Sequence, residues 1–234
     1  MSGPETPSTT ALSASFLDRL DDELADADAQ LSGHYPGDPG TRQPVHTVYV
    51  NADLADEQLL ARWAAGARAV LASTAPDPTA AAALELPVAG DDLDAVLKLV
   101  RAKLDAEPIE DLRLDFEDGY GNRPDEEEDR DAIRVAALLP TLLGDPAGPL
   151  LAGIRFKSLE KPTRRRGLRT LDLVVSGLLA AGPLPAGFLV TLPKVTSVDQ
   201  VSAMVGICEE LERVHGLPAG ALRFEIQIET TQAI

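Results

Sequence analysis

The sequence has one cysteine, three histidines and only 4% aromatic residues. Cys208 has no partner for an internal disulfide, which excludes a disulfide-stabilised scaffold and favours a reducing compartment. The chain also lacks a run of about 18 apolar residues, so we expect no membrane-spanning helix. The first basic residue, Arg19, follows a Ser/Thr/Pro-rich start without an apolar core, which argues against a secretion signal. Together these absences predict a cytoplasmic protein that does not associate with membranes.

Positive charge is also scarce. Lysine and arginine number 21 against 38 acidic residues, and the formal net charge is −17. A protein that binds nucleic acid neutralises phosphates with clustered basic side chains, and this chain has only one short basic run, at 164–166. We therefore expect no nucleic-acid partner.

What the chain does contain is the composition of a folded protein. Of its 234 residues, 44% are hydrophobic and 25% are charged, which is typical of globular domains. Residues 1–12 carry too little apolar surface to order and are expected to form a mobile arm. Residues 13–44 are expected to form an amphipathic helix and a Pro/Gly-rich linker. Residues 45–234 then form the main domain.

Within that domain, short β-rich segments alternate with amphipathic helices. Two helices, near 59–70 and 93–104, separate the first two strands, with a loop around Pro76 and Pro78 between them. Single helices at 128–143, 164–181 and 197–215 separate the later strands. Strands joined by helices in this way run parallel. The sequence therefore predicts the α/β class, with strands near 46–51, 111–116, 151–156, 187–192 and 223–228.

Apolar and polar residues alternate along these strands. In the last one, Leu222, Phe224 and Ile226 oppose Arg223 and Glu225. Strands of an open doubly wound sheet are usually apolar on both faces, whereas a barrel that holds a polar site near its mouth needs one polar face. We therefore predict a (β/α)8 TIM barrel with an N-terminal helical extension; a sheet with one solvated face is the alternative. Only five of the eight strands are present, so we expect a fragment, a truncated product, or strands supplied from elsewhere.

Ionisable residues gather where these strands end. In a parallel barrel all carboxyl ends of the strands open onto one face, so residues far apart in sequence meet there. Carboxylates held together in this way suit Mg²⁺ or Mn²⁺, and an arginine beside them suits a substrate carboxylate. The alternative is that Asp115 and Glu117 form ion pairs with Arg113 and Arg155 inside the barrel. The residues at the strand ends are Asp115, Glu117, Asp118, Arg155, Lys194 and Glu229.

Five sequence motifs around these residues occur in an order that is also found in a known protein family. They are LDFEDGYG, EDRDAIR, GIRFKS, LPKV and QIETTQAI. In order and spacing, residues 45–234 resemble the citrate lyase beta-subunit and HpcH/HpaI aldolase family, which belongs to the phosphoenolpyruvate/pyruvate TIM-barrel superfamily. The DFED segment is also similar to malate synthases. In EDRDAIR, Arg130 stands where the family has a lysine.

The resemblance implies a Mg²⁺-dependent lyase or aldolase that makes or breaks a carbon–carbon bond through an enolate. Its substrate would be a 2-oxo or β-hydroxy carboxylate or the coenzyme A thioester of one. When the functional residues of that family are assigned to the matching positions of this chain, Glu229 would be a metal ligand, and Arg155 and Gln227 would bind substrate. Glu117 and Asp118 would be catalytic through metal-bound water. A second metal ligand is expected beyond residue 234, and the full-length protein is expected to be a homo-oligomer.

Other interpretations remain open at this point. The missing strands and an altered first strand, VNADL, are compatible with a non-catalytic remnant or a partner-binding subunit of the same fold. Malate-synthase-like acyl transfer and phosphoenolpyruvate-dependent chemistry rank lower, the latter because no histidine is expected at the barrel mouth. Lys194 is expected to have a structural role in the turn that begins at Pro193.

Overall fold

The computed structural model describes residues 11–38, 40–88 and 90–234, and the chain divides into two units. The first ten residues of the predicted arm lie outside the described part. The unit that ends at Gln43 contains helix α1 (Ala14–His34). The hydroxyl of Ser13 accepts a hydrogen bond from the backbone N–H of Phe16 and caps this helix. No residue of α1 is buried, so its leucines are exposed.

The unit from Pro44 to Ile234 is an α/β structure, as predicted. Its five strands form one sheet in the order β1-β2-β3-β4-β5, and every neighbouring pair is parallel. Each strand falls in a segment that the sequence pattern predicts. Their bounds are β1 (Val48–Asn51), β2 (Asp111–Asp115), β3 (Leu151–Arg155), β4 (Phe188–Leu192) and β5 (Phe224–Ile226).

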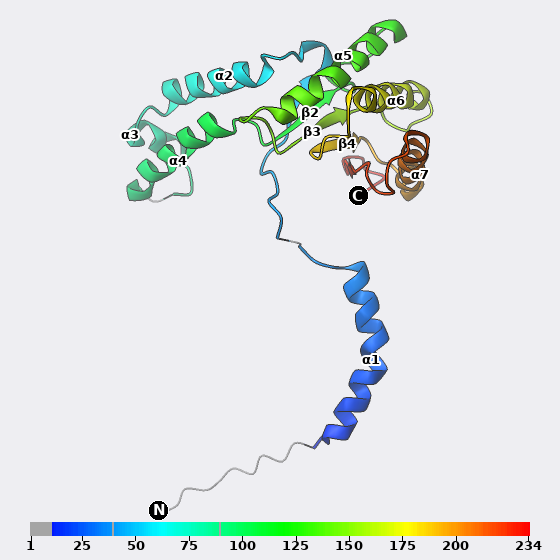
Figure 1. Cartoon of the computed structure of the whole chain (residues 1–234). Helices are drawn as coiled ribbons and strands as arrows, with labels where there is room; N and C mark the ends of the chain where they lie inside the picture. Colours follow the sequence, from blue (N-terminus) through cyan, green and yellow to red (C-terminus); the bar gives the residue numbers. More distant parts are fainter. Residues whose placement is uncertain (1–10, 39, 89) are drawn as a thin grey trace, which may run out of the picture. The chain divides into compact units, whose positions relative to one another are not determined.

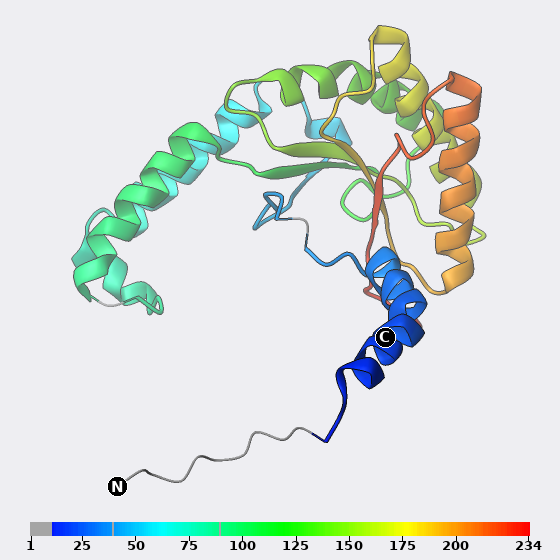
Figure 2. The same cartoon turned by 60° about the horizontal axis from the view of Figure 1, so that its bottom comes forward.

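One face of the sheet is apolar and is covered by helices. Figures 1 and 2 show α5 (Asp125–Gly144), α6 (Arg164–Ala181) and α7 (Val198–His215) along this face. Side chains of alternate strand positions point into the layer between sheet and helices, and each contributes about 1.5–3 kcal/mol to stability by burial. Those that are at most 1% exposed include Leu112, Leu114, Phe116, Ile154, Phe156, Phe188, Val190 and Leu192.

The other face is polar and concave. In a flat sheet β1 and β5 would lie about 19 Å apart, at roughly 4.8 Å per strand. Yet the side-chain amide of Gln227, just after β5, donates to the Tyr49 hydroxyl on β1 at 3.2 Å. Likewise the guanidinium of Arg113 on β2 reaches the Glu225 carboxylate on β5 at 3.0 Å. The sheet is therefore strongly curved, and the side chains of its first and last strands meet across the concave face.

A helical arm is inserted between β1 and β2. Helices α2 (Leu59–Thr74) and α4 (Leu93–Ala106) run side by side away from the sheet (Figures 1 and 2), and a small separate core holds them together. The loop expected around Pro76 and Pro78 is present at residues 75–77. A short helix that the sequence pattern did not predict follows it, α3 (Pro78–Ala81), because the Asp77 carboxylate caps the N–H of Ala80 and Pro78 is in the first helical position.

Cys208 lies in the main core on α7, where burial raises the pKa of its thiol to about 11. Such a thiol is protonated at neutral pH and acts as an apolar packing group.

Among the described residues, no helix is both long and apolar enough to cross a bilayer.

Candidate functional site

The carboxyl ends of the five strands lie at one edge of the sheet. Because the strands are parallel and in consecutive order, one row of paired residues crosses the whole sheet near this edge. The loops that follow the strands begin there, so residues that are more than a hundred positions apart in sequence become neighbours. The row is Asn51, Asp115, Arg155, Thr191 and Glu225.

Asp115 is the organising residue of this edge. Its carboxylate accepts two hydrogen bonds from Arg155, from Nε at 2.7 Å and from Nη2 at 2.8 Å. It also accepts from the backbone N–H groups of Glu117 at 3.0 Å and Gly119 at 3.2 Å. One buried carboxylate thus orients the arginine and fixes the turn that carries Glu117 and Asp118.

The same turn is held from the neighbouring strand. The side-chain amide of Asn51 donates to the carbonyl of Gly119 at 2.8 Å. A Cβ at position 119 would lie only 2.1 Å from the Asn51 Oδ1 atom, so this close approach requires glycine. Behind the turn, the ammonium of Lys157 donates to the Phe116 carbonyl and to the buried Glu128, both at 2.7 Å. The β2–α5 turn is therefore rigidly placed.

Arg155 presents one remaining nitrogen to the concave face. Its Nη1 lies 3.5 Å from the Gln227 Oε1 atom and 3.8 Å from a Glu117 oxygen, while its guanidinium stacks 4.5 Å above the Tyr49 ring. Burial disfavours the charged form, but the hydrogen bonds from Arg155 to Asp115 outweigh this and raise the pKa of Arg155. The arginine is permanently charged, and Nη1 is its one guanidinium nitrogen that Asp115 does not bind.

Lys194 joins the two carboxylates of the β2–α5 turn. Its ammonium contacts both Glu117 and Asp118, and its backbone N–H donates to the Glu229 Oε1 atom at 3.1 Å. The residue has a left-handed backbone, with φ of +51°, which is uncommon outside glycine. The structure thus links Glu117 and Asp118 to the side chain of Lys194 and links Glu229 to its backbone. The sequence placed this lysine among the ionisable residues at the strand ends but expected its role to be structural.

Glu117 and Asp118 have opposite electrostatic environments although they are adjacent. Burial raises the pKa of Glu117, and the contact with Lys194 only partly offsets this. The hydrogen bond from Lys194 lowers the pKa of Asp118. Two carboxyl groups whose pKa values are separated in this way suit a proton acceptor beside a group that stays ionised.

The site contains carboxylate and amide oxygens, which are the ligand type that a hard divalent cation prefers. The Glu117 side chain is 9% exposed, and its Oε2 atom has no hydrogen-bond partner. Gln227 is half-buried, and Glu229 is exposed at the same strand edge. The described residues contain no cluster of three or more histidine, cysteine or acidic side chains preformed for a metal. Mg²⁺ is commonly held by one or two carboxylates and keeps several waters, but Glu117 and Asp118 already contact the Lys194 ammonium.

Below this edge, polar side chains form a hydrogen-bonded network on the concave face, in which the Arg113 Nη2 atom has no partner. Arg113 is fully buried; its Nε donates to Thr191 at 2.8 Å and to Glu225 at 3.0 Å, and its Nη1 contacts Asp111. The ion pairs that the sequence offered as an alternative therefore exist for Arg155, with Asp115 and with Glu117, whereas Arg113 pairs with Asp111 and Glu225. Periodicity placed Glu225 on this face but did not reveal its partner.

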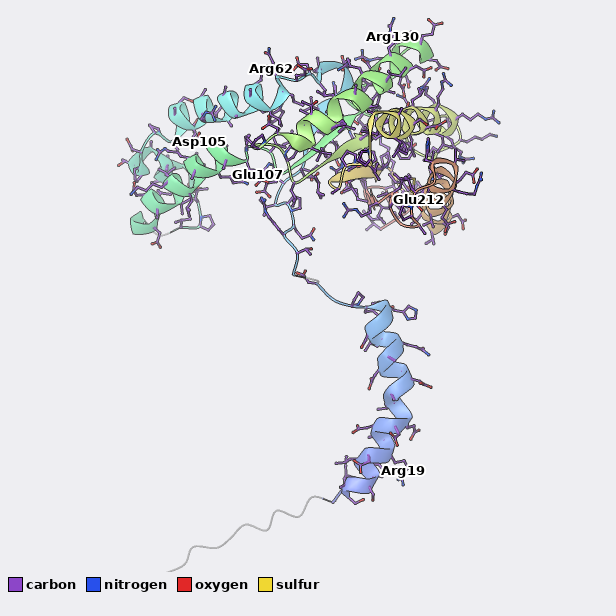
Figure 3. All side chains as sticks on the ribbon, in the orientation of Figure 1. Arg19, Arg62, Asp105, Glu107, Arg130 and Glu212 are labelled. Atoms are coloured by element: carbon purple, nitrogen blue, oxygen red, sulfur yellow. The ribbon has the colours of Figure 1, made fainter. Side chains whose placement is uncertain are left out.

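β5 is positioned from α7. Glu212, labelled in Figure 3, is buried, and its carboxylate accepts from the backbone N–H groups of Gly220 at 3.0 Å and Leu222 at 2.7 Å. These bonds fix the loop that enters β5. They thereby set the register of the strand that delivers Gln227 and Glu229.

The EDRDAIR motif has a structural role on α5. Arg134 bonds the carbonyls of Ala52 and Ala55 and the Asp131 carboxylate, which ties α5 to the segment after β1. Arg130 is exposed on the same helix (Figure 3). A hollow of 690 Å³ beside Arg134 is lined by none of the predicted site residues.

Comparison with known proteins gives a family but no activity. No curated protein matches the chain. Residues 24–234 match the model of a family described as a domain of unknown function, DUF6986, and this match includes all five strands and the whole candidate site. The chain therefore belongs to the DUF6986 family.

Proposed function

We propose that this protein is a Mg²⁺-dependent carbon–carbon lyase or aldolase of the citrate lyase beta type. Its substrate would be a 2-oxo or β-hydroxy carboxylate or the corresponding coenzyme A thioester. The observation that carries the proposal is the meeting of Glu117, Asp118, Glu229 and the Arg155 Nη1 atom at the carboxyl edge of one parallel sheet. The order of motifs in the sequence supports the same assignment.

We further propose that the curved sheet is five strands of a TIM barrel. Two features support this. The strand order is strictly consecutive, whereas doubly wound sheets reverse order at a switch point. The contact between Tyr49 and Gln227 also requires curvature of the kind that closes barrels. We also propose that the full-length protein is a homo-oligomer. It would be located in the cytoplasm, where Cys208 stays reduced.

In this mechanism the chain's own groups bind the substrate and move a proton. Arg155 Nη1 binds a carboxylate or enolate oxygen, and the Gln227 amide and Tyr49 hydroxyl line the same face. Glu117, whose pKa is raised by burial, accepts the proton that leaves when the bond breaks, and Asp118 stays ionised beside it.

The cation would be held by Glu229, with Glu117 and Asp118 reaching it through bound water, and Mn²⁺ is the alternative to Mg²⁺. When bound, it supplies a Lewis acid that stabilises negative charge on an oxygen next to the reacting carbon. Arg155, whose Nη1 atom lies 3.8 Å from a Glu117 oxygen, would reinforce this stabilisation with a fixed positive charge.

A non-catalytic, partner-binding role is the second candidate, and one observation favours it. The hydrogen-bonding fork of Arg155 is already filled by Asp115, and Lys194 already neutralises Glu117 and Asp118. Because these charged groups already pair with one another, the structure is stable without a bound substrate. Acyl transfer of the malate synthase type and phosphoenolpyruvate chemistry gain no comparable support.

Exchange of deuterium for hydrogen tests catalysis without knowledge of the full substrate. Pyruvate, oxaloacetate and acetyl-coenzyme A would each be incubated with the protein and Mg²⁺ in D₂O and followed by NMR at the carbon next to the carbonyl. We expect exchange that falls about 100-fold or more in Glu117→Gln, the typical range for loss of a general base. Asp94→Asn, on the exposed face of α4, is the matched control and should exchange normally. Absence of exchange with all three compounds would favour the partner-binding role.

A further inference from the structure

Helix α1 carries an apolar stripe that is exposed. No residue of α1 is buried, and the leucines of the stripe are 37–60% exposed. A helix of 21 residues has little stability on its own in water, because most helices in proteins are stabilised by burial of an apolar face. The stripe is therefore a surface that another molecule can cover. Its leucines are Leu17, Leu20, Leu24 and Leu31.

The spacing of this stripe is that of a coiled coil. Leu17 and Leu20 lie at positions a and d of a heptad. The next a and d positions are Leu24, Ala27 and Leu31. Alternating steps of three and four residues keep a narrow seam facing one other helix, whereas a helix that packs on a globular core usually has a wider apolar face. We therefore expect a single helix to cover the seam.

The positions that flank the seam are acidic. Side chains at e and g of a coiled coil contact the partner helix and determine which partner is accepted. From residue 16 to residue 30, three of these positions carry carboxylates and none is basic, while Phe16 and Gln30 are uncharged. The acidic residues are Asp21 and Asp28 at e and Glu23 at g.

This charge pattern argues against several partners. In a dimer of two α1 helices, carboxylates at e and g would face one another, and α1 has six acidic side chains against one arginine. An anionic membrane surface or a nucleic acid would be repelled by the same side chains. The charge complement of the seam is a helix with lysine or arginine at its own e and g positions.

We propose that α1 is a docking helix for a basic amphipathic helix of another protein, with which it forms a coiled coil. The leucines of α1 fill the seam, and basic side chains of the partner pair with Asp21, Glu23 and Asp28. Ala27, the small residue at a d position, accommodates a larger apolar side chain of the partner. None of the candidate site residues lies in α1, so this partner would bind whether or not the protein is a lyase.

Binding of two synthetic peptides to the full chain tests the charge preference. Both peptides have three heptads with leucine at a and d; one has lysine at every e and g position, and the other has glutamate there. Fluorescence anisotropy of the labelled peptides would measure binding at about 50 mM NaCl and at higher salt. We expect the lysine peptide to bind about tenfold more tightly or better than the glutamate peptide, and its binding to weaken as salt is added.

Two variants separate docking on the seam from general attraction by the net charge of −17. Leu20→Gln places a polar amide in the seam and should weaken binding of the lysine peptide about tenfold or more. Ala25→Gln, at position b outside the seam, introduces the same side chain and is the matched control, which should bind as wild type does. Glutamine is a good helix former, so both variants keep the helix.

Reversal of the flanking charges tests the specificity directly. A triple variant with Asp21→Lys, Glu23→Lys and Asp28→Lys keeps the leucine seam and should prefer the glutamate peptide. Three reversals add six charges, so the net charge of this variant changes from −17 only to −11. A switch in preference therefore cannot come from the net charge.

Several results would overturn the proposal. These are equal binding of the two peptides to wild type, no binding of either peptide, equal effects of Leu20→Gln and Ala25→Gln, and an unchanged preference in the triple variant. Sedimentation velocity of the wild-type chain provides a further check. Self-association that Leu20→Gln abolishes would show that a second copy covers the seam, which would also contradict a basic partner.

Discussion

Replacement of Asp115 by asparagine should weaken the contact that holds Arg155 in place and should lower the stability of the fold. The carboxylate is 3% exposed and the Arg155 side chain is 11% exposed, so their two hydrogen bonds lie in a poorly solvated environment. Asparagine has the same shape but has no charge, and one of its two acceptor positions becomes a donor that faces a guanidinium N–H. Removal of one partner of a buried ion pair costs about 3–5 kcal/mol. Total stability of a domain is about 5–15 kcal/mol, so the change should be large.

Urea unfolding followed by circular dichroism would measure this loss, in a double-mutant cycle with Arg155→Met. Each single variant leaves one buried charge unpaired, whereas the double variant leaves none. We therefore expect the loss in the double variant to be well below the sum of the two single losses. A loss below about 1 kcal/mol for Asp115→Asn, or additive losses in the cycle, would refute the central role of this pair.

Two further predictions concern packing and pH. A Cβ added at Gly153 would lie 1.6 Å from the Leu189 carbonyl oxygen, so Gly153→Ala should lower the melting temperature sharply. A Cβ added at Gly206 would meet no atom within 4 Å, so Gly206→Ala is the control and should leave the melting temperature unchanged or raise it slightly. The hydrogen bond from Arg169 lowers the pKa of Asp129 below its usual 3.8; this pair therefore stabilises the fold above pH 3.8 and loses its effect as pH falls further. In urea titrations, Asp129→Asn should thus be less stable than wild type at pH 7, and the difference should shrink below pH 4; an undiminished difference would contradict the assignment.

The sheet was predictable from sequence because its two faces have different requirements. Side chains such as Leu114 and Ile154 must be apolar to pack against helices, so the alternation along each strand indicates both strand and face. The order of strands follows from the crossover helices. The short helix α3 was not predictable from periodicity because one turn is too short to show it, although Asp77 and Pro78 carry its start signal.

The partners within the site were less predictable. The sequence placed Glu117, Asp118 and Glu229 at one edge of the sheet, but contacts between loops depend on curvature that no local pattern encodes. The left-handed backbone that aims the Lys194 ammonium at Glu117 is a property of a single residue. Likewise, the pattern marked Arg155 as a ligand-binding group but could not show that Asp115 holds most of its hydrogen-bonding capacity.

The central claim is that carboxylates at the strand ends form a divalent-cation site. Calorimetric titration of Mg²⁺ into wild type, Glu229→Gln and Glu117→Gln tests it most directly, with Asp94→Asn as the exposed control on α4. We predict saturable binding of one Mg²⁺ per chain to wild type and to the control, and binding about tenfold weaker or more in each of the two site variants, since Glu229→Gln loses a charged oxygen ligand and Glu117→Gln loses a charge that holds metal-bound water. Identical titrations for wild type and Glu229→Gln, or no saturable binding to wild type, would contradict the account.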